Sequence, residues 1–310
     1  MDIIRGEHNI RPRHRGCVAT IGNFDGVHRG HQAVIAALKE RARASGARAT
    51  VVLFEPQPAE YFARAAPPAR LTRLREKAEL LAGLGVEQLL VLPFDQQMAS
   101  RPADEFVSRC LIEGLDIRGL IVGDDFKFGS HRSGDFRLLQ RFAETHGFSI
   151  DRAESFIEAG ERVSSTSIRG LLREGRLAEV VPLLGRHYYI AGRVVHGQKK
   201  GREMGFATAN IDLHRLASPL HGIFAARVHG IDDGVALPAI AYVGYRPIVN
   251  GTRAVLEVHV FDFDRDVYGR YLKVDFHAKI RDDLPFTDFD ALGRQIARDC
   301  DDARRLLAAG

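Results

Sequence analysis

Short apolar runs alternate with helical segments from Cys17 to about Gly185. The apolar runs read CVATI, ATVVLF, EQLLVLPF and IRGLIVG, and the segments with apolar residues at helical spacing read QAVIAALKERARA, REKAELLAGLG, ADEFVSRCLIEGL and DFRLLQRFAETHG. Strands separated by helices of about ten to fifteen residues are typical of βαβ units, in which helices cover both faces of a parallel sheet. The pattern therefore predicts an α/β domain, doubly wound around a parallel sheet, over residues 1–185.

The pattern changes after His187, where strands follow one another closely. Six strand-like segments, separated by turns rich in Gly, Asp and Pro, read YYIAGRVVHG, FATANIDL, GIFAARVHG, LPAIAYVG, RAVLEVHVFDF and YLKVDFHAKI. Such spacing favours an antiparallel barrel or a sandwich. The last segment, FDALGRQIARDCDDARRLLA, has apolar residues at helical spacing that include Phe289, Leu292, Ile296 and Leu306. We expect this helix to pack on the β domain, which is predicted to span residues 186–310.

The composition is that of a soluble globular protein and leaves room for two domains. The 310 residues are 45% hydrophobic and 27% charged, close to the averages for such proteins. The net charge is +4 at pH 7, and the arginines are scattered rather than gathered in a basic block. We expect a surface that tolerates anionic small ligands and no nucleic-acid partner. The basic pI near 9.0 leaves a nucleic-acid-binding barrel as an alternative.

The cysteines and the N-terminus bear on the cellular compartment. Cys17, Cys110 and Cys300 are odd in number, far apart and without CxxC spacing, which supports neither a disulfide framework nor a zinc cluster. We therefore expect thiols in a reducing compartment. The N-terminal residues lack the apolar core of a signal peptide, and no stretch approaches the roughly 18 apolar residues of a membrane span. We expect a cytoplasmic protein without a membrane partner.

The segment GNFDGVHRGH, at residues 22–31, joins a predicted strand to a predicted helix. Ligands of open α/β sheets bind at the carboxyl ends of the strands, and a helix N-terminus presents N–H groups and a positive dipole end to anions. His28 and His31 are three residues apart, so their imidazoles share one helix face and are placed to hydrogen-bond phosphates. The glycines permit close backbone approach to a ligand. A phosphate site is predicted here, with a helix cap or core packing as the alternative for a single histidine.

A second glycine-rich segment, VVHGQKKGREMGFATAN, is cationic and lies in the β domain. It lacks the GxxxxGK[ST] spacing of a P-loop, but its flexible backbone and positive charge suit a phosphate-binding nest. Thr208 and Asn210 are two apart in a predicted strand, so their side chains point to the same face. A hydroxyl and an amide oxygen are hard ligands suited to Mg²⁺. For this pair taken alone, exposed polar strand residues are the alternative.

Several motifs, in order, resemble those of the bifunctional bacterial riboflavin kinase/FMN adenylyltransferases. In the N-terminal half they are GNFDGVHRGHQ, with the HxGH signature of the adenylyltransferase superfamily, and FEPQPAEYF, RLTRLREKAELL, LVLPFD, VGDDFKFG and SSTSIR. In the C-terminal half, GREMGFATAN and RAVLEVHVFDFDRDVYGR are similar to riboflavin kinase segments. The resemblance spans Cys17 to about Ala308. It implies an HxGH-type nucleotidyltransferase domain, then a six-stranded antiparallel β-barrel kinase domain with a terminal helix.

The resemblance implies two reactions that together make FAD from riboflavin. ATP would phosphorylate riboflavin to FMN, and FMN would then receive the adenylyl group of a second ATP with release of pyrophosphate. ATP is the implied co-substrate and Mg²⁺ the implied cofactor, while riboflavin, FMN and FAD are substrates and products. The resemblance leaves the oligomeric state unknown.

For the adenylyltransferase module, the resemblance implies that His28 and His31 act in catalysis on the ATP phosphates. Ser165 and Thr166 can also cap the helix that follows them, while Arg169 can clamp a phosphate. The implied ATP-binding set comprises Gly22, Asn23, Phe24, Asp25, His28, His31, Ser165, Thr166 and Arg169. Core packing is the alternative for each aromatic member of the implied flavin-binding set. That set comprises Phe62, Asp125, Phe126 and Phe128.

For the kinase module, the resemblance implies that Glu257 takes the proton from the riboflavin 5′-hydroxyl as this oxygen attacks the γ-phosphate of ATP. Thr208 and Asn210 are the implied magnesium ligands, and Arg270 is the implied flavin contact. The implied phosphate-binding set of the kinase comprises Gly197, Lys199, Gly201, Arg202 and Gly205.

Three positions depart from the family pattern. Ala207 stands where proline is usual, and Tyr245 and Ile248 stand where threonine is usual. Alanine can adopt the same dihedral angle at an entropic cost of about 0.4–1 kcal/mol, so we expect weaker pre-organisation of the kinase loop rather than a lost site. The departures keep open an alternative function, an FMN adenylyltransferase with a non-catalytic, flavin-sensing barrel.

Overall fold

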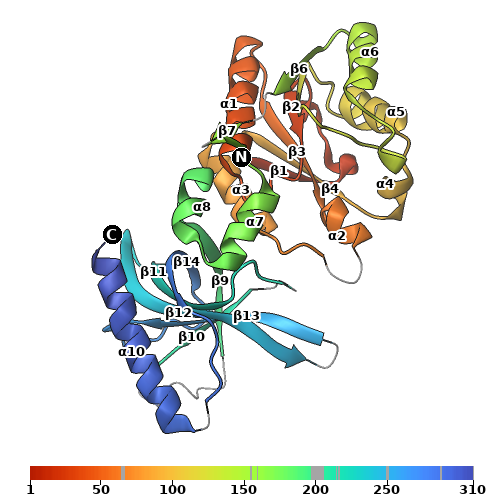
Figure 1. The fold of residues 1–310 in the computed structure, drawn as a ribbon. Helices are drawn as coiled ribbons and strands as arrows, with labels where there is room; N and C mark the ends of the chain where they lie inside the picture. Colours follow the sequence, from red (N-terminus) through yellow and green to blue (C-terminus); the bar gives the residue numbers. More distant parts are fainter. Residues whose placement is uncertain are drawn as a thin grey trace. The chain divides into compact units, whose positions relative to one another are not determined.

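The computed structural model describes most of the chain, and Figure 1 shows its fold. The described residues are 1–63, 67–153, 156–158, 160–196, 206–213, 215, 217–248, 251–286 and 288–309. The chain divides into two compact units. Unit 1 comprises Met1–Pro68 and Thr72–Ser164, and unit 2 comprises Ala69–Leu71 and Ser165–Gly310.

Unit 1 is built on a six-stranded sheet with the strand order β1-β4-β3-β2-β5-β6. Its strands are β1 (Asp2–Arg5), β2 (Val18–Ile21), β3 (Ala49–Glu55), β4 (Gln88–Pro93), β5 (Gly119–Gly123) and β6 (Ser149–Ala153). Every neighbouring pair is parallel, so each connection must cross over the sheet. The helices are α1 (Arg29–Ala44), α2 (Pro58–Phe62), α3 (Leu74–Gly83), α4 (Gln96–Ser100), α5 (Ala103–Phe106), a π-helix (Val107–Gly114) and α6 (Phe136–His146). The predicted doubly wound α/β domain is confirmed.

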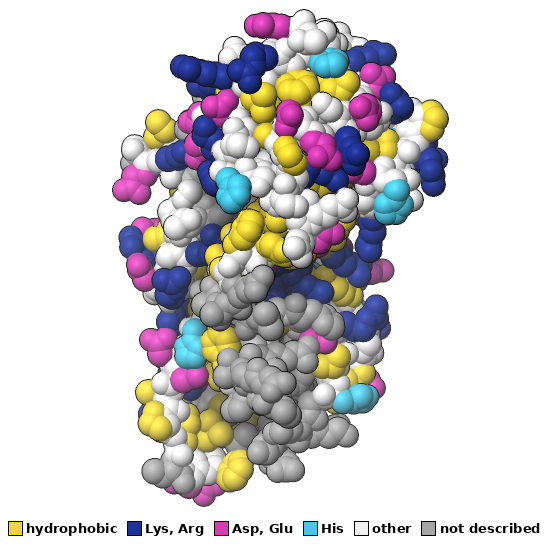
Figure 2. All heavy atoms as spheres, turned by 90° about the vertical axis from the view of Figure 1, so that its right-hand side faces the viewer, with side chains coloured by type: hydrophobic (Ala, Val, Ile, Leu, Met, Phe, Trp, Pro, Cys, Tyr) yellow, Lys and Arg dark blue, Asp and Glu magenta, His cyan; other side chains and the backbone are white. Residues whose placement is uncertain are grey.

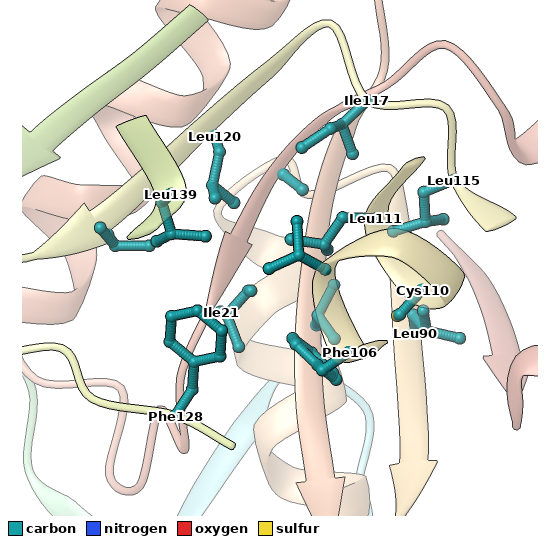
Figure 3. Packing of buried hydrophobic residues seen from close by; sticks show 14 of the residues in the cluster. Ile21, Leu90, Phe106, Cys110, Leu111, Leu115, Ile117, Leu120, Phe128 and Leu139 are labelled. Atoms are coloured by element: carbon teal, nitrogen blue, oxygen red, sulfur yellow. The ribbon is translucent and has the colours of Figure 1, made fainter. Parts of the chain in front are cut away.

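Each face of this sheet is buried by its own hydrophobic cluster. In β2, Val18 belongs to one cluster while Ala19 and Ile21 belong to the other, because successive side chains of a strand point to opposite faces. Helices α1 and α3 cover the first face, with Ile35 and Leu81 among their buried residues. Helix α5, the π-helix and α6 cover the second face, whose packing is shown in Figure 3. Burial on both faces explains why the strands read as continuous apolar runs.

The strand order changes direction at β2, and this fixes where a ligand can bind. The chain leaves β2 for β3 and β4 on one side, and it later crosses to β5 and β6 on the other side. In open α/β sheets, ligands bind beyond the carboxyl ends of the strands at such a switch point. The loops that follow β2 and β5 carry the motifs GNFDGVHRGH and VGDDFKFG. Because β2 and β5 are paired neighbours, the two motifs begin side by side.

Unit 2 contains a closed barrel with the strand order β10-β13-β12-β11-β14-β9. Its antiparallel strands are β9 (Tyr188–Val195), β10 (Ala209–Asp212), β11 (Gly222–Asp232), β12 (Val235–Ile248), β13 (Gly251–Val260) and β14 (Tyr271–Arg281). Its helices are α7 (Ser165–Glu174), α8 (Leu177–Leu184) and α10 (Phe289–Ala308). Of the two architectures that the strand pattern allowed, the barrel is therefore the observed one, because the sheet closes on itself without free edges.

Helix α10 packs on the barrel, which confirms the predicted closing helix. Its packed face is a stripe of residues spaced by three or four, which comprises Ile296, Cys300, Ala303 and Leu307. Two of the apolar positions in the predicted periodicity, Phe289 and Leu306, are exposed instead. For Leu306 the reason is helical phase, since burial of the next residue, Leu307, turns Leu306 about 100° away toward solvent.

Unit 2 begins earlier in the chain than the domain predicted over residues 186–310. Helix α8 packs on β9 and β14, and α7 packs on α8, so both helices belong to the unit that contains the barrel. Unit 2 also includes the segment Ala69–Leu71. Three side chains from elsewhere in this unit donate hydrogen bonds to the successive backbone carbonyl oxygens of the segment. The hydrogen bonds are from Arg169 to Ala69 at 2.7 Å, from Arg215 to Arg70 at 3.1 Å and from Tyr188 to Leu71 at 3.1 Å. The boundary at 185/186 remains a prediction about the two modules.

The distribution of surface charge and the state of the three thiols can be compared with what the sequence predicts. On the face shown in Figure 2, Lys and Arg side chains are interspersed with Asp and Glu. Cys17, Cys110 and Cys300 are all free and buried, and burial raises the pKa of the Cys17 and Cys300 thiols to about 11. These three are therefore protonated core thiols. Across the described ranges, the structure has no helix that combines the length and apolar character of a membrane span.

Truncation of one buried isoleucine should destabilise unit 1 strongly. Ile35 of α1 is 1% exposed, so Ile35→Ala should lower the free energy of unfolding by about 2–5 kcal/mol through lost burial and an unfilled cavity. The matched control is Ile157→Ala, because Ile157 is 62% exposed and should change stability by at most about 0.5 kcal/mol. Urea unfolding followed by circular dichroism measures both; equal losses would contradict the assigned core.

Candidate functional site

The loop after β2 is a strained turn that leads directly into α1. Phe24, Gly26 and Val27 have positive φ angles of 47°, 83° and 42°. Glycine adopts such a conformation without cost, but a β-branched residue such as Val27 is strained there by about 1–3 kcal/mol. The turn is held by side chains, since Gln32 donates from Nε2 to the Val27 carbonyl oxygen at 3.0 Å. A strained backbone kept in place by its surroundings is typical of a ligand-binding loop.

His28 is the N-cap of α1 and is 6% exposed. Its Nδ1 accepts a long hydrogen bond of 3.4 Å from the His31 backbone N–H, so Nε2 carries the proton of the neutral ring. The two imidazoles stack with ring centroids 3.6 Å apart. Gly30 makes room for this pair, because a Cβ there would lie 3.1 Å from the His28 ring. The motif therefore places both rings at the start of one helix, where N–H groups and the helix dipole favour an anion.

His31 is held as a neutral imidazole. Burial lowers its pKa well below 6.5, and the charges of His28 and Lys77 lower it further. Its Nδ1 is inaccessible and has no hydrogen-bond partner among the described residues. An unprotonated Nδ1 avoids burying an unpaired N–H, so the proton belongs on Nε2. His31 is thus a neutral hydrogen-bond donor beside the helix N-terminus.

Asp25 is buried and works as a scaffold of the turn. Its Oδ1 accepts hydrogen bonds from the Thr72 backbone N–H at 3.0 Å and from the Thr72 hydroxyl at 3.2 Å. The Thr72 hydroxyl oxygen in turn accepts from the Gly26 N–H at 2.9 Å. Lys77 Nζ donates to the Asn23 carbonyl oxygen at 2.5 Å. The turn is therefore fixed from the segment that precedes α3 and from α3 itself.

The loop after β5 brings acidic and aromatic residues beside this turn. Arg162, in the hairpin of β7 (Ile157–Glu158) and β8 (Glu161–Arg162), pairs with Asp124 at 3.3 Å and with Asp125 at 3.1 Å. The Asp125 hydrogen bond is the main reason why the pKa of Arg162 is raised. The hairpin is thereby tied to the loop, and a bound anion would compete with both carboxylates for the same guanidinium.

The predicted aromatic contacts fall in different environments. Phe62 is 66% exposed at the end of α2 and packs edge-on against Tyr61 and Phe94. Phe126 is partly buried and stacks on Phe128, with ring centroids 5.3 Å apart. Phe128 is 7% exposed and belongs to the core cluster on one face of the sheet, and Phe24, which is 3% exposed, belongs to the cluster on the other face. Among these aromatic residues, Phe62 is the one whose ring is open to a ligand.

The predicted segment SSTSIR begins at Ser164, the last residue of unit 1, and continues into unit 2. Helix α7 begins at Ser165, so Ser165 and Thr166 lie within its first turn, and the residue before the helix is Ser164. Hydroxyls and N–H groups at the first turn of a helix are suited to phosphate oxygens. Arg169 follows one turn later on the same helix face and donates from Nε to Ala69.

The barrel carries a second set of polar side chains in one row. Asn210 of β10 lies opposite Glu257 of β13, and Glu257 lies opposite Tyr242 of β12. Leu256 and Val258, on either side of Glu257, are buried inside the barrel, so Glu257 points to the outer face. Residues directly opposite on neighbouring strands have side chains in contact range. The row thus aligns an amide, a carboxylate and a phenol across three strands.

A cavity of about 200 Å³ lies at the start of β10, and its lining does not include the three residues of this row. Barrel valines and the loop after β13 line it, together with the segment before β10. The lining residues are Val194, Ala207, Thr208, Ala209, Val258, Val260, Phe263, Asp264, Arg265, Asp266, Val267 and Tyr268. Strand β10 begins at Ala209, so Thr208 precedes it and lines the cavity, whereas Asn210 faces Glu257. The cavity has an apolar floor and a polar rim, as nucleotide sites commonly have.

Several kinase predictions can be compared with contacts in the barrel. His259 lies 2.9 Å from the Ala207 carbonyl oxygen, so this backbone is anchored where proline is usual. The Tyr245 hydroxyl binds the backbone of Ser218 at 3.2 Å on both its N–H and its carbonyl. Arg270 donates to the Ile231 carbonyl oxygen at 2.6 Å. Gly197, Lys199, Gly201, Arg202 and Gly205 lie outside the described residues, as does the side chain of Ile248.

Four residues of these sites were not predicted individually: Thr72, Lys77, Arg162 and Tyr242. Thr72 and Lys77 fall in the motif RLTRLREKAELL, whose lysine reads as a solvent-facing helix residue. Arg162 lies just before SSTSIR, at a position that no motif in the sequence marks as functional. Tyr242 would have been found by pairing the predicted strands, because it lies opposite Glu257.

Two family models, one for each half of the chain, match this protein. The FAD synthetase family model matches residues 10–167, and the riboflavin kinase family model matches residues 184–307. The chain is 47% identical over 300 residues to the bifunctional riboflavin kinase/FMN adenylyltransferase of Escherichia coli (strain K12), covering 96% of each chain. The chain belongs to the bifunctional riboflavin kinase/FMN adenylyltransferase family.

Other members of this family are equally similar over the full length. The relative from Pseudomonas fluorescens is 48% identical over 309 residues, covering 99% of this chain and 98% of its own. A crystal structure titled as a macrolide-efflux protein from Streptococcus pneumoniae has a TM-score of 0.81 at 29% identity, with 98% of this chain and 99% of that chain covered. This riboflavin kinase/FMN adenylyltransferase chain therefore shares its fold with a solved structure over nearly its full length.

The neutral state of His31 predicts a pH dependence of stability. The folded pKa lies below the unfolded value of 6.5, so below pH 6.5 the unfolded chain binds a proton that the folded chain does not. The free energy of unfolding should therefore fall as the pH drops below 6.5, and His31→Gln should remove this part. Urea unfolding over a pH series measures it, with the exposed His146→Gln as control. Parallel pH curves for the wild type and His31→Gln would contradict the assignment.

Proposed function

We propose that this chain makes FAD from riboflavin in two ATP-dependent steps, one in each unit. The barrel phosphorylates riboflavin to FMN, and the α/β unit transfers the adenylyl group of a second ATP to FMN. The observation that carries the proposal is the presence of two chemically different polar sets in two compact units. One set stacks two imidazoles at a helix N-terminus, and the other aligns a carboxylate and an amide across a barrel.

Adenylyl transfer needs alignment and charge stabilisation rather than a nucleophile from the enzyme. A phosphate oxygen of FMN attacks the α-phosphorus of ATP, the new P–O bond forms, and the bond to pyrophosphate breaks. His28 and His31 donate hydrogen bonds from Nε2 to the phosphates, where the N–H groups at the start of α1 add to the positive potential. Because these donors are held at the start of α1, they need little reorganisation as charge develops.

The remaining adenylyltransferase residues are proposed to bind the two substrates. Ser165 and Thr166 bind ATP phosphates at the first turn of α7, and Arg169 adds a guanidinium with five N–H donors. Phe62 is the proposed ring contact for the flavin, since its ring is exposed. Asp125 and Phe126 come from the neighbouring loop. The ring of Phe128 lies in the core. We therefore assign Phe128 only an indirect role, in which it shapes that loop by stacking on Phe126.

In the barrel, Glu257 is the proposed general base. It takes the proton from the riboflavin 5′-hydroxyl as that oxygen attacks the γ-phosphorus of ATP, and the bond between the γ-phosphate and ADP breaks. The cavity lined by Thr208 and Tyr268 is the proposed nucleotide site. The unpredicted Tyr242 lies opposite Glu257 and donates to Asp283 at 3.2 Å, which fixes its ring beside the base.

The barrel residues fit a magnesium ion that arrives with ATP. Thr208, Asn210 and Glu257 offer hydroxyl, amide and carboxylate oxygens, the hard ligands that Mg²⁺ prefers. In the described part of the chain, no group of three or more His, Cys, Asp or Glu side chains is arranged to hold a metal by itself. Thr208 and Asn210 would therefore hold the ion together with phosphate oxygens. When bound, it supplies positive charge to the transferring phosphoryl group.

Two substitutions should separate the reactions. His28→Ala should abolish FAD formation while FMN still accumulates, because one of the stacked phosphate donors is lost. Glu257→Ala should slow FMN formation about 10²–10⁴-fold, the usual contribution of a general base, while FAD is still made from supplied FMN. Chromatography of flavins measures both, and each variant serves as the folding control of the other. Loss of both reactions in either folded variant would contradict the two-site assignment.

Asn210 should control the magnesium requirement of the kinase alone. Asn210→Ala removes an oxygen ligand, so riboflavin phosphorylation should need about tenfold more Mg²⁺ for half-maximal rate, equivalent to about 1.4 kcal/mol of binding. FMN adenylylation by the same variant is the internal control and should keep its Mg²⁺ dependence. An unchanged requirement in the kinase reaction would remove Asn210 from the proposed metal site.

A further inference from the structure

Lys77 is a buried charge beside the phosphate-binding turn. It lies on α3 and is 0% exposed, among the largest fully buried side chains of the protein. Burying an ammonium costs desolvation energy that an apolar residue of similar size would avoid. Its neighbours on the helix, Ala78 and Leu81, supply apolar packing without that cost. The ammonium therefore contributes something that packing alone does not require.

The first contribution is the orientation of a peptide group in the turn. Lys77 Nζ donates to the Asn23 carbonyl oxygen at 2.5 Å. The carbonyl and the N–H of a trans peptide point in opposite directions, so this bond turns the Phe24 N–H away from Lys77. Phe24 itself has a φ of 47°, a conformation that needs outside support. Lys77 thereby fixes the backbone directly after β2.

The second contribution is electrostatic. Two titratable groups act on His31, namely His28 on the same helix terminus and Lys77 from α3, and both add to the effect of burial. A positive charge that cannot move away opposes a second positive charge on the imidazole. Lys77 thus favours the neutral, donating form of His31 and adds positive potential for a phosphate.

We propose that Lys77 is a positioning residue for adenylyl transfer, which holds the turn through the Asn23 carbonyl and places a fixed positive charge beside His31. This role rests on the proposed use of His28 and His31 in binding ATP phosphates. Lys77 touches the turn rather than the reacting atoms, and its effect on the reaction passes through Asn23 and His31.

The test compares Lys77→Met, Lys77→Arg and Lys39→Met in the full-length protein. Lys77→Met should lower kcat/KM for FMN adenylylation about 10²-fold, as expected when a binding loop is misplaced. It should also move the acid limb of the pH profile to higher pH, because a charge beside His31 is lost. Lys77→Arg should restore the position of that limb, and Lys39→Met, in the middle of α1, should leave rate and profile unchanged.

Two readouts separate this role from a merely structural one. Riboflavin phosphorylation by the same variants reports on the intact barrel and should be unchanged. Titration of His31 by NMR in the wild type and in Lys77→Met should show the pKa rising in the variant. An unchanged acid limb with an unchanged His31 titration would overturn the proposal, even if the rate falls. Should Lys77→Met fail to fold, ordinary titration of His31 near 6.5 in the wild type would overturn it.

The proposed function has its own, separate failure. If His31→Ala leaves FMN adenylylation unchanged, the histidine does not serve the reaction, whatever the variants at Lys77 do. If His31→Ala is inactive while Lys77→Met keeps the wild-type profile and rate, the proposed function stands and the role of Lys77 is overturned.

Discussion

Burial of the turn between β2 and α1 is the constraint on which the α/β unit depends. A strained backbone, an N-capping histidine and a carboxylate are enclosed at the switch point of the sheet, where each polar group must find a partner or stay neutral. The Asp25 carboxylate accepts hydrogen bonds from Thr72, and the Asn23 carbonyl accepts one from Lys77. His31 instead stays neutral, with its buried Nδ1 unprotonated. The same burial that costs stability holds the turn and the two imidazoles rigidly, and these imidazoles are the proposed phosphate donors.

The barrel solves a similar problem by strand register. Its interior is filled by apolar side chains, so polar chemistry is confined to the outer face and to the loops. Register then sets Asn210, Glu257 and Tyr242 in one row, because each lies opposite the next on a neighbouring strand. A shift of one residue in β13 would replace Glu257 by a buried aliphatic residue and remove the carboxylate. Closure of the barrel protects this register, since it leaves no edge strand that could slip.

Much of this arrangement could be predicted from the sequence, because apolar runs and helical spacing are local signals. β2 to β5, the barrel and α10 follow from them, and the motifs are the basis of the two proposed sites. β1, β6 and the β7–β8 hairpin were missed, since β1 buries only Ile4, β6 has no fully buried residue and the hairpin strands are two residues long. Lys77 could not be predicted as buried, because its partner Asn23 is 54 residues away and a lysine in a helix normally faces solvent.

The central claim is that one chain performs both steps, the kinase step in the barrel included, despite Ala207 and Tyr245. The most direct measurement incubates the purified protein with riboflavin, ATP and Mg²⁺ and follows FMN and FAD by chromatography, beside a reaction started from FMN. The account predicts that FMN appears first and is then converted to FAD, and that the second reaction yields FAD without delay. Formation of FAD from FMN with no product from riboflavin would contradict it, and would leave the barrel as a non-catalytic flavin-binding domain.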